Sequence, residues 1–198
     1  MQAAFYIELE DGDDRLEIPW ADPTHPANCF YDLKAEPGRL DQISETRDNP
    51  PLRGFLATLN APDTVFATAK CDIWQTDEFG PEERETFPQA QTKFAGYVDV
   101  NFSGDSLNFD RRHYEQLARR LIPLLLPAPA AARVELCLRR CYYRGREAWG
   151  FYLTVFLYGY GRDAAEAKNE WAAGLKALES ALLRLSAALQ QALRQAGS

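Results

Sequence analysis

Residues 133–158 constrain the fold more than any other stretch of this chain. Residues 133–143 and 148–158 alternate apolar and polar side chains, and Arg144-Gly145-Arg146-Glu147 between them is typical of a turn. The second segment is apolar on both faces, which is typical of a strand inside a sheet. We therefore predict a β-hairpin whose second strand is central to the sheet.

The N-terminal region carries a second hairpin pattern. Residues 4–10 and 15–20 alternate in the same way on either side of an Asp11-Gly12 turn signal. Residues 21–37 are then rich in proline and aspartate, and a short helix is predicted over 37–46 before the Asn49-Pro50-Pro51 breaker. The chain would thus begin with two paired strands and a loop.

Two further half-buried strands are predicted over 65–74 and 93–103, with a densely charged loop or single helical turn between them. Each would turn alternate residues toward the core. For the first strand these residues are Val65, Ala67, Ala69, Cys71 and Ile73, and for the second they are Phe94, Gly96, Val98, Val100 and Phe102.

Two longer helices complete the pattern. Residues 110–126 have apolar side chains at helical spacing, with Asn108 or Asp110 as a candidate N-cap and Pro123 expected to kink or end the helix. A second helix is predicted over about 163–195, capped by Asp163. Its leucines form a heptad seam, which predicts either packing on the sheet or self-association as a homodimer. The residues expected at such a dimer contact are Leu178, Leu182, Leu185 and Leu189.

Together these patterns predict a single α+β domain over 1–198, with a largely antiparallel sheet of about six strands built from hairpins, a kinked middle helix and a long C-terminal helix. The first residues lack the pattern of a secretory signal, and no apolar run is long enough for a membrane helix. We expect a cytoplasmic protein that needs no metal or cofactor. Its cysteines, Cys29, Cys71, Cys137 and Cys141, would then be reduced.

Charge is divided into blocks along the chain. Residues 1–109 carry 21 acidic and 8 basic side chains, whereas residues 110–162 carry 10 arginines and 4 acids. Such asymmetry indicates electrostatic selection of a partner. The preferred hypothesis is a non-enzymatic protein whose acidic first half binds a basic protein partner, in an inhibitor, immunity-like or adaptor role.

The arginine-rich hairpin, residues 133–162, supports an alternative function. Guanidinium groups bind phosphates, and aromatic rings stack on bases, so this region could bind nucleic acid or a phosphate ligand. The candidate residues are Arg139, Arg140, Arg144, Arg146, Tyr143, Trp149 and Arg162. The competing interpretation is that the arginines pair with the protein's own acids while the aromatics fill the core.

Catalysis is a second alternative, because the chain has many carboxylates that could converge in the fold. They include Asp72, Asp77, Glu78, Glu82, Glu83, Glu85 and Asp99, and nothing in the sequence identifies which would act. No nucleophile–base signature identifies a pair. A GxGxxA pattern at residues 159–164 lies between a strand and a helix, but no further strand follows, as a dinucleotide fold would require. We interpret its glycines as belonging to a tight corner.

Overall fold

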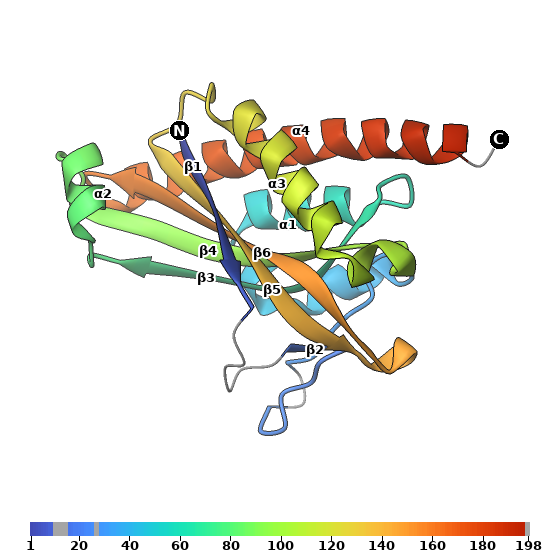
Figure 1. Ribbon diagram of the computed structural model, residues 1–198. Helices are drawn as coiled ribbons and strands as arrows, with labels where there is room; N and C mark the ends of the chain where they lie inside the picture. Colours follow the sequence, from blue (N-terminus) through green and yellow to red (C-terminus); the bar gives the residue numbers. More distant parts are fainter. Residues whose placement is uncertain (10–15, 26–27, 197–198) are drawn as a thin grey trace.

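A six-stranded sheet forms the centre of the protein (Figure 1). The computed structural model describes residues 1–9, 16–25 and 28–196. The strands are β1 (Gln2–Glu8), β2 (Leu16–Ile18), β3 (Phe66–Thr76), β4 (Thr92–Phe102), β5 (Ala132–Tyr143) and β6 (Ala148–Gly161). Their order is β1-β5-β6-β4-β3, with β2 also paired to β5. The predicted α+β class, with a mostly antiparallel sheet and a long C-terminal helix, is confirmed.

The predicted N-terminal hairpin is wrong. β1 pairs in parallel with residues 133–139 of β5, and β2 pairs in parallel with residues 141–143 of the same strand. The two segments therefore run in the same direction along one edge. The Asp11-Gly12 turn signal lies outside the described residues. Alternation identifies a half-buried strand but not its partner. Because β6 pairs with only one edge of β5, the other edge of β5 can accept both β1 and β2.

An irregularity in β3 changes which of its residues share a face. The register with β4 shifts between Thr68 and Lys70. Successive side chains of a strand point to opposite faces of the sheet, so one extra residue moves every later side chain of β3 to the opposite face from the one that simple alternation predicts. The predicted common face from Val65 to Ile73 is therefore interrupted, and Lys70 is paired with Asp99 on the side opposite the helices.

One face of the sheet is covered by α1 (Pro50–Leu59), α3 (Arg111–Leu125) and α4 (Ala164–Ala196), as Figure 1 shows. α1 was not predicted, because Pro50 and Pro51 were interpreted as a breaker. Proline is tolerated in the first turn of a helix, and the Asn49 side chain caps this one by accepting a hydrogen bond from the Leu52 amide. Pro123 lies inside α3, where the kink stays a prediction.

The leucine seam of α4 packs inside the chain. Leu178, Leu182 and Leu185 are buried in the core together with residues of α1 and α3, and Leu189 packs against its border. Side chains that are buried in this way are not available to a second copy. Self-association stays a prediction; Leu178, Leu182 and Leu185 are used in the core of this chain, whereas Leu189 is half-buried.

Two glycines let α4 lie directly on β6. A Cβ at Gly159 would lie 2.2 Å from the Trp171 amide nitrogen, and a Cβ at Gly161 would lie 2.3 Å from the Ala167 amide nitrogen. These positions explain the GxGxxA pattern as helix-on-strand packing. No helix among the described residues is long and apolar enough to cross a membrane.

In the part of the chain that the structure describes, the opposite face of the sheet carries no long helix. At one end it is covered by β2 and the segment that follows, where Ile18 packs with Cys141, Tyr143 and Tyr152 in a small second core. The Trp20 indole N–H donates a hydrogen bond of 2.7 Å to the Ala69 carbonyl and fastens this segment to β3. The segment and the sheet enclose the site described next.

Candidate binding cleft

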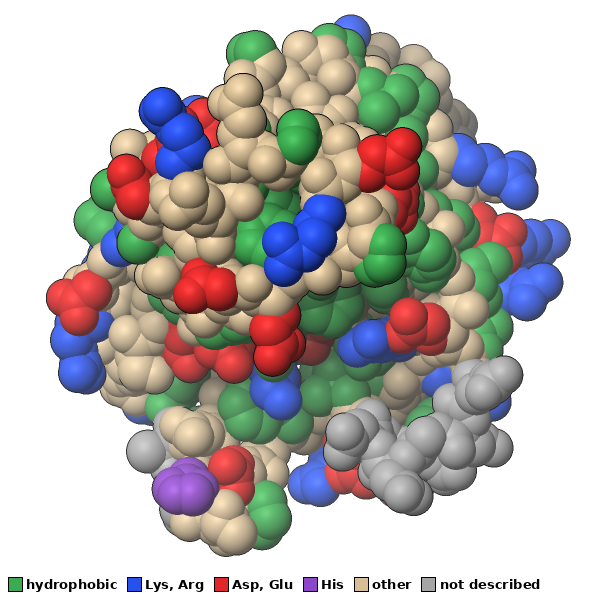
Figure 2. All heavy atoms as spheres, turned by 90° about the vertical axis from the view of Figure 1, so that its left-hand side faces the viewer, with side chains coloured by type: hydrophobic (Ala, Val, Ile, Leu, Met, Phe, Trp, Pro, Cys, Tyr) green, Lys and Arg blue, Asp and Glu red, His purple; other side chains and the backbone are tan. Residues whose placement is uncertain are grey.

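A cavity of about 830 Å³ lies between the open face of the sheet and residues 16–45. We call it the cleft. Figure 2 views the molecule from a side on which it is hollowed, with acidic side chains along the upper border of the hollow and basic ones within and below it. Its wall comes from β3, β4, β5 and β6 on one side and from the N-terminal segment on the other. It is large enough for a small ligand or a side chain with its flanking backbone.

Asp99 forms part of the sheet wall of the cleft. Val98 and Val100 point into the core, so alternation turns Asp99 to the open face, where it pairs in register with Thr154. The Thr154 hydroxyl donates a hydrogen bond of 2.7 Å to Asp99 Oδ1. Only 4% of Asp99 is exposed, and this burial raises the pKa of its carboxyl to about 6. Within the described chain, no donor contacts the other carboxylate oxygen.

Two further carboxylates, Glu45 and Asp72, lie near the same wall. The negative charges of these acids affect Tyr97. Burial raises the pKa of the Tyr97 hydroxyl, and the charges of Asp99, Asp72 and Glu45 raise this pKa further. Among the described residues, neither Glu45 nor Asp72 forms an ion pair with lysine or arginine. The cleft therefore holds unneutralised negative charge.

Two of the three basic side chains that line the cleft, Arg139 and Arg144, have acidic partners among the described residues, whereas Lys70 contacts an aromatic ring. Arg139 donates two hydrogen bonds, of 2.6 and 2.9 Å, to the Glu8 carboxylate, and Arg144 forms an ion pair with Glu17. The Lys70 ammonium lies 5.4 Å from the centre of the Trp20 ring. The two arginines are thus held by acids of the N-terminal half, which is the internal pairing that the sequence left open.

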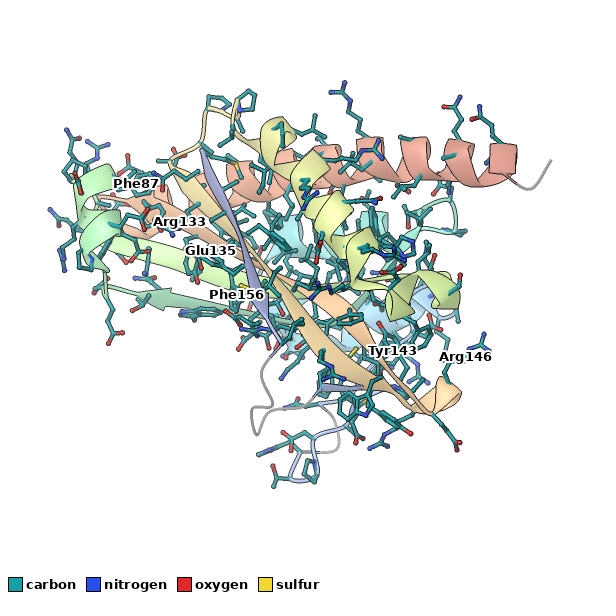
Figure 3. The ribbon with its side chains drawn as sticks, in the orientation of Figure 1. Phe87, Arg133, Glu135, Tyr143, Arg146 and Phe156 are labelled. Carbon is teal, nitrogen blue, oxygen red and sulfur yellow. The ribbon has the colours of Figure 1, made fainter. Side chains whose placement is uncertain are left out.

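The predicted arginine surface is divided by the fold. Arg139 and Arg144 line the cleft, whereas the Arg140 guanidinium lies 5.5 Å from the Trp149 ring centre on the other face of the hairpin. Arg146 lies in the exposed hairpin turn (Figure 3). The structure thus does not gather the predicted set into one contiguous ridge.

Two members of the set are accounted for by other contacts. Tyr143 is only 7% exposed, and its hydroxyl donates to the Phe151 carbonyl. Arg162 lies beyond the other end of β6 and pairs with Glu166. Tyr143 is thus buried beside the hairpin turn, and Arg162 lies at the opposite end of β6.

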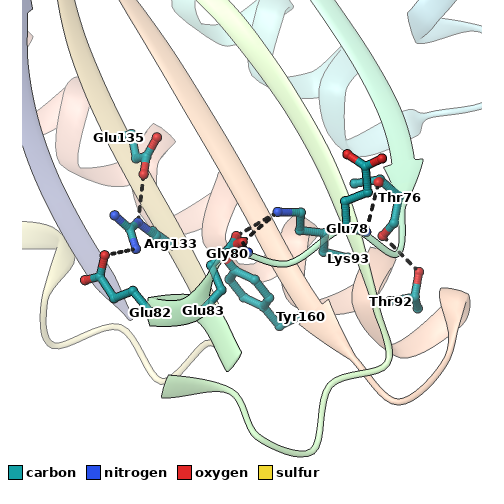
Figure 4. A network of polar contacts seen from close by, with 10 residues as sticks. All are labelled: Thr76, Glu78, Gly80, Glu82, Glu83, Thr92, Lys93, Arg133, Glu135 and Tyr160. Carbon is teal, nitrogen blue, oxygen red and sulfur yellow. Dashed lines mark hydrogen bonds and ion pairs between the residues drawn. The ribbon is translucent and has the colours of Figure 1, made fainter. Parts of the chain in front are cut away.

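A polar network closes the end of the sheet away from β2 (Figure 4). Arg133 pairs with Glu82 and with Glu135, at 3.1 and 2.8 Å. Glu83 accepts hydrogen bonds from Lys93 and from the Tyr160 hydroxyl, and these bonds lower its carboxyl pKa although burial opposes them. The network fixes the short helix α2 (Pro81–Thr86) against the sheet, so its charges serve the fold.

Three of the four thiols are poor nucleophiles at neutral pH. Burial raises the pKa of Cys71, Cys137 and Cys141 to about 12 in each case. The four cysteines are free of disulfides. In the part of the chain that the structure describes, no group of three or more His, Cys, Asp or Glu side chains is arranged to hold a metal ion.

Sequence reasoning named Asp99 only as one of many carboxylates and did not name Tyr97, Thr154 or Trp20 as site residues. Alternation could have placed Asp99 and Tyr97 on the face opposite the valines. Nothing in the sequence indicated that the N-terminal segment would fold over that face. Comparison with protein family models, curated proteins and solved structures finds no match to this chain.

Proposed function

We propose that the protein binds a basic protein partner, in an inhibitor, immunity-like or adaptor role, and that the cleft is the centre of the contact. The observation that carries the proposal is the unpaired state of Glu45, Asp72 and Asp99 among the described residues, while the arginines of the cleft are neutralised by Glu8 and Glu17. The imbalance of 21 acidic against 8 basic side chains in residues 1–109 also favours a negatively charged surface that binds a positively charged partner. Complementary charge accelerates encounter and rejects partners of like charge.

A labelled oligo-arginine peptide is a suitable probe for this proposal. Its binding is measured by fluorescence anisotropy at about 50 and about 200 mM salt, because contacts between exposed charges weaken as salt screens them. The variant Glu45→Gln with Asp72→Asn removes two charges at the cleft. The control, Asp77→Asn with Glu85→Gln, removes two exposed charges that do not line it.

The cleft variant is expected to weaken oligo-arginine binding by about fivefold or more, and the control by less than about twofold. Equal weakening by the two variants would mean that only net charge matters, and it would overturn the proposal. A labelled single-stranded oligonucleotide is titrated in parallel. Tight, salt-sensitive oligonucleotide binding that is lost on replacing Arg144 and Arg146 with alanine would instead favour the nucleic-acid alternative.

A second candidate function is acid–base catalysis in the cleft. It is favoured by one observation, the Asp99 carboxyl with a pKa raised to about 6 inside a cavity, which is a common property of catalytic acids. A panel of nitrophenyl glycosides and esters tests it. Turnover with an inflection near pH 6 that disappears in Asp99→Asn would support catalysis, and absence of turnover across the panel would leave binding as the function.

A further inference from the structure

The inference starts from the incomplete environment of Asp99. Acidic side chains are seldom fully buried unless they are paired. Asp99 is 4% exposed, yet among the described residues it receives one hydrogen bond, from Thr154, and no ion pair; the charges of Lys70 and Arg139 lower its carboxyl pKa without offsetting the effect of burial. Because Asp99 lines the cleft, a group that enters the cleft can reach the carboxylate. The missing partner would be a donor that carries positive charge.

The rings beside Asp99 also suit a cation. Tyr97 and Phe156 lie next to each other on β4 and β6, with ring centres 5.7 Å apart, and Trp20 lines the same cleft from the N-terminal segment. A positive charge is attracted to the face of an aromatic ring. The protein uses this contact itself: the Arg139 guanidinium lies 5.4 Å from the centre of the Phe156 ring.

We infer that the cleft receives an arginine side chain of the basic partner, with Asp99 as its carboxylate anchor and the Tyr97 and Phe156 rings as its wall. This inference rests on the proposed function. Arginine fits better than lysine because a planar guanidinium can stack on a ring while its N–H groups donate to a carboxylate. Glu45 and Asp72 near the wall would favour entry of a cation and oppose entry of an anion.

The probe is Nα-acetyl-arginine amide, titrated into ¹⁵N-labelled protein and followed by NMR. Nα-acetyl-citrulline amide is the matched control, since it keeps the shape of arginine without the charge. We expect saturable shifts of the Tyr97, Asp99 and Thr154 amides with the arginine compound and at least about tenfold weaker binding of the citrulline compound. The lysine analogue is expected to bind more weakly than arginine. Equal shifts with the arginine and citrulline compounds would overturn the inference.

Asp99→Asn keeps the shape of the side chain and removes its charge, so it should weaken binding of the arginine compound by at least about fivefold, while Glu85→Gln should not change it. The two proposals can fail separately. If oligo-arginine binds through Glu45 and Asp72 but the arginine amide causes no shift in the cleft, the arginine pocket is wrong and the proposed function stands. If the amide binds in the cleft while oligo-arginine binding is insensitive to Glu45 and Asp72, the pocket stands and the proposed function is wrong.

Discussion

At the scale of single residues, Asp99 destabilises the fold when it is ionised. Its carboxyl pKa is raised by burial from an ordinary value of 3.8 to about 6. The folded protein therefore binds the proton more tightly than the unfolded chain, and stability is lost as pH rises from about 4 through about 6. Functional sites often contain a buried charged side chain that lowers the stability of the folded protein, because the function requires that charge to be removed from water.

Asp99→Asn should therefore raise the free energy of unfolding at pH 8 by about 2 kcal/mol and leave it nearly unchanged near pH 4. Asparagine can still accept the Thr154 hydrogen bond, so packing is kept. Urea denaturation at the two pH values measures the difference. A loss of stability at pH 8 would show that the charge is compensated in the folded state, contrary to the environment described for Asp99.

At the scale of elements, the contact between α4 and β6 depends on the absence of a side chain at Gly159. A Cβ there would meet the backbone of α4 at 2.2 to 2.6 Å, and backbone cannot move aside as a flexible side chain can. Gly159→Ala should destabilise the protein by about 3 kcal/mol or more through overpacking. Thermal unfolding followed by circular dichroism would show it.

Gly54 provides the opposite case within α1. It is exposed, and a Cβ added there would meet no atom within 4 Å. Gly54→Ala should stabilise the protein by about 0.5–1 kcal/mol, because alanine loses less backbone entropy in a helix than glycine does. If both glycine variants changed the melting temperature in the same direction, close packing of α4 would not explain the Gly159 result.

The elements also show where sequence reasoning succeeds and fails. Periodicity is a local property, so residues 132–143 and 148–161 and the helices over 111–125 and 164–196 could be predicted from it. The bulge at Thr68/Lys70 left no visible pattern, and Pro50-Pro51 is compatible with either a helix start or a loop. The parallel pairing of β1 with β5 depends on which strand edge is available once the other strands have paired. A local sequence pattern carries no information about that edge.

At the scale of the whole molecule, the acidic and basic blocks of the sequence meet across the sheet. Glu8 with Arg139, Glu17 with Arg144 and Glu82 with Arg133 each join the first half of the chain to the arginine-rich block. Among the described residues, three acids without an ion pair, Glu45, Asp72 and Asp99, line the cleft. The charge blocks suggested an acidic binding surface, which stays a prediction, and they did not indicate its place, because pairing cancels charges that are distant in sequence.

Arg144→Ala tests this balance of charge. The change frees Glu17 at the edge of the cleft, so the affinity for oligo-arginine should rise by about two- to fivefold. Arg162→Ala is the matched control, since it removes an arginine from an exposed pair with Glu166 outside the cleft. The anisotropy assay compares the two variants. Reduced affinity in Arg144→Ala, or the same gain in both variants, would contradict a cleft that selects cations.

The pairing of β1 and β2 with β5 also bears on how the chain matures during synthesis. The only strand partner of β1 and β2 among the described residues is β5, at residues 133–143. These early segments therefore cannot join the sheet until the ribosome has produced most of the chain. The Glu8 and Glu17 contacts that neutralise Arg139 and Arg144 form with them. Arg139 and Arg144 therefore gain their acidic partners, and the cleft gains its N-terminal wall, in the same late step, once β5 and the turn that follows it have emerged.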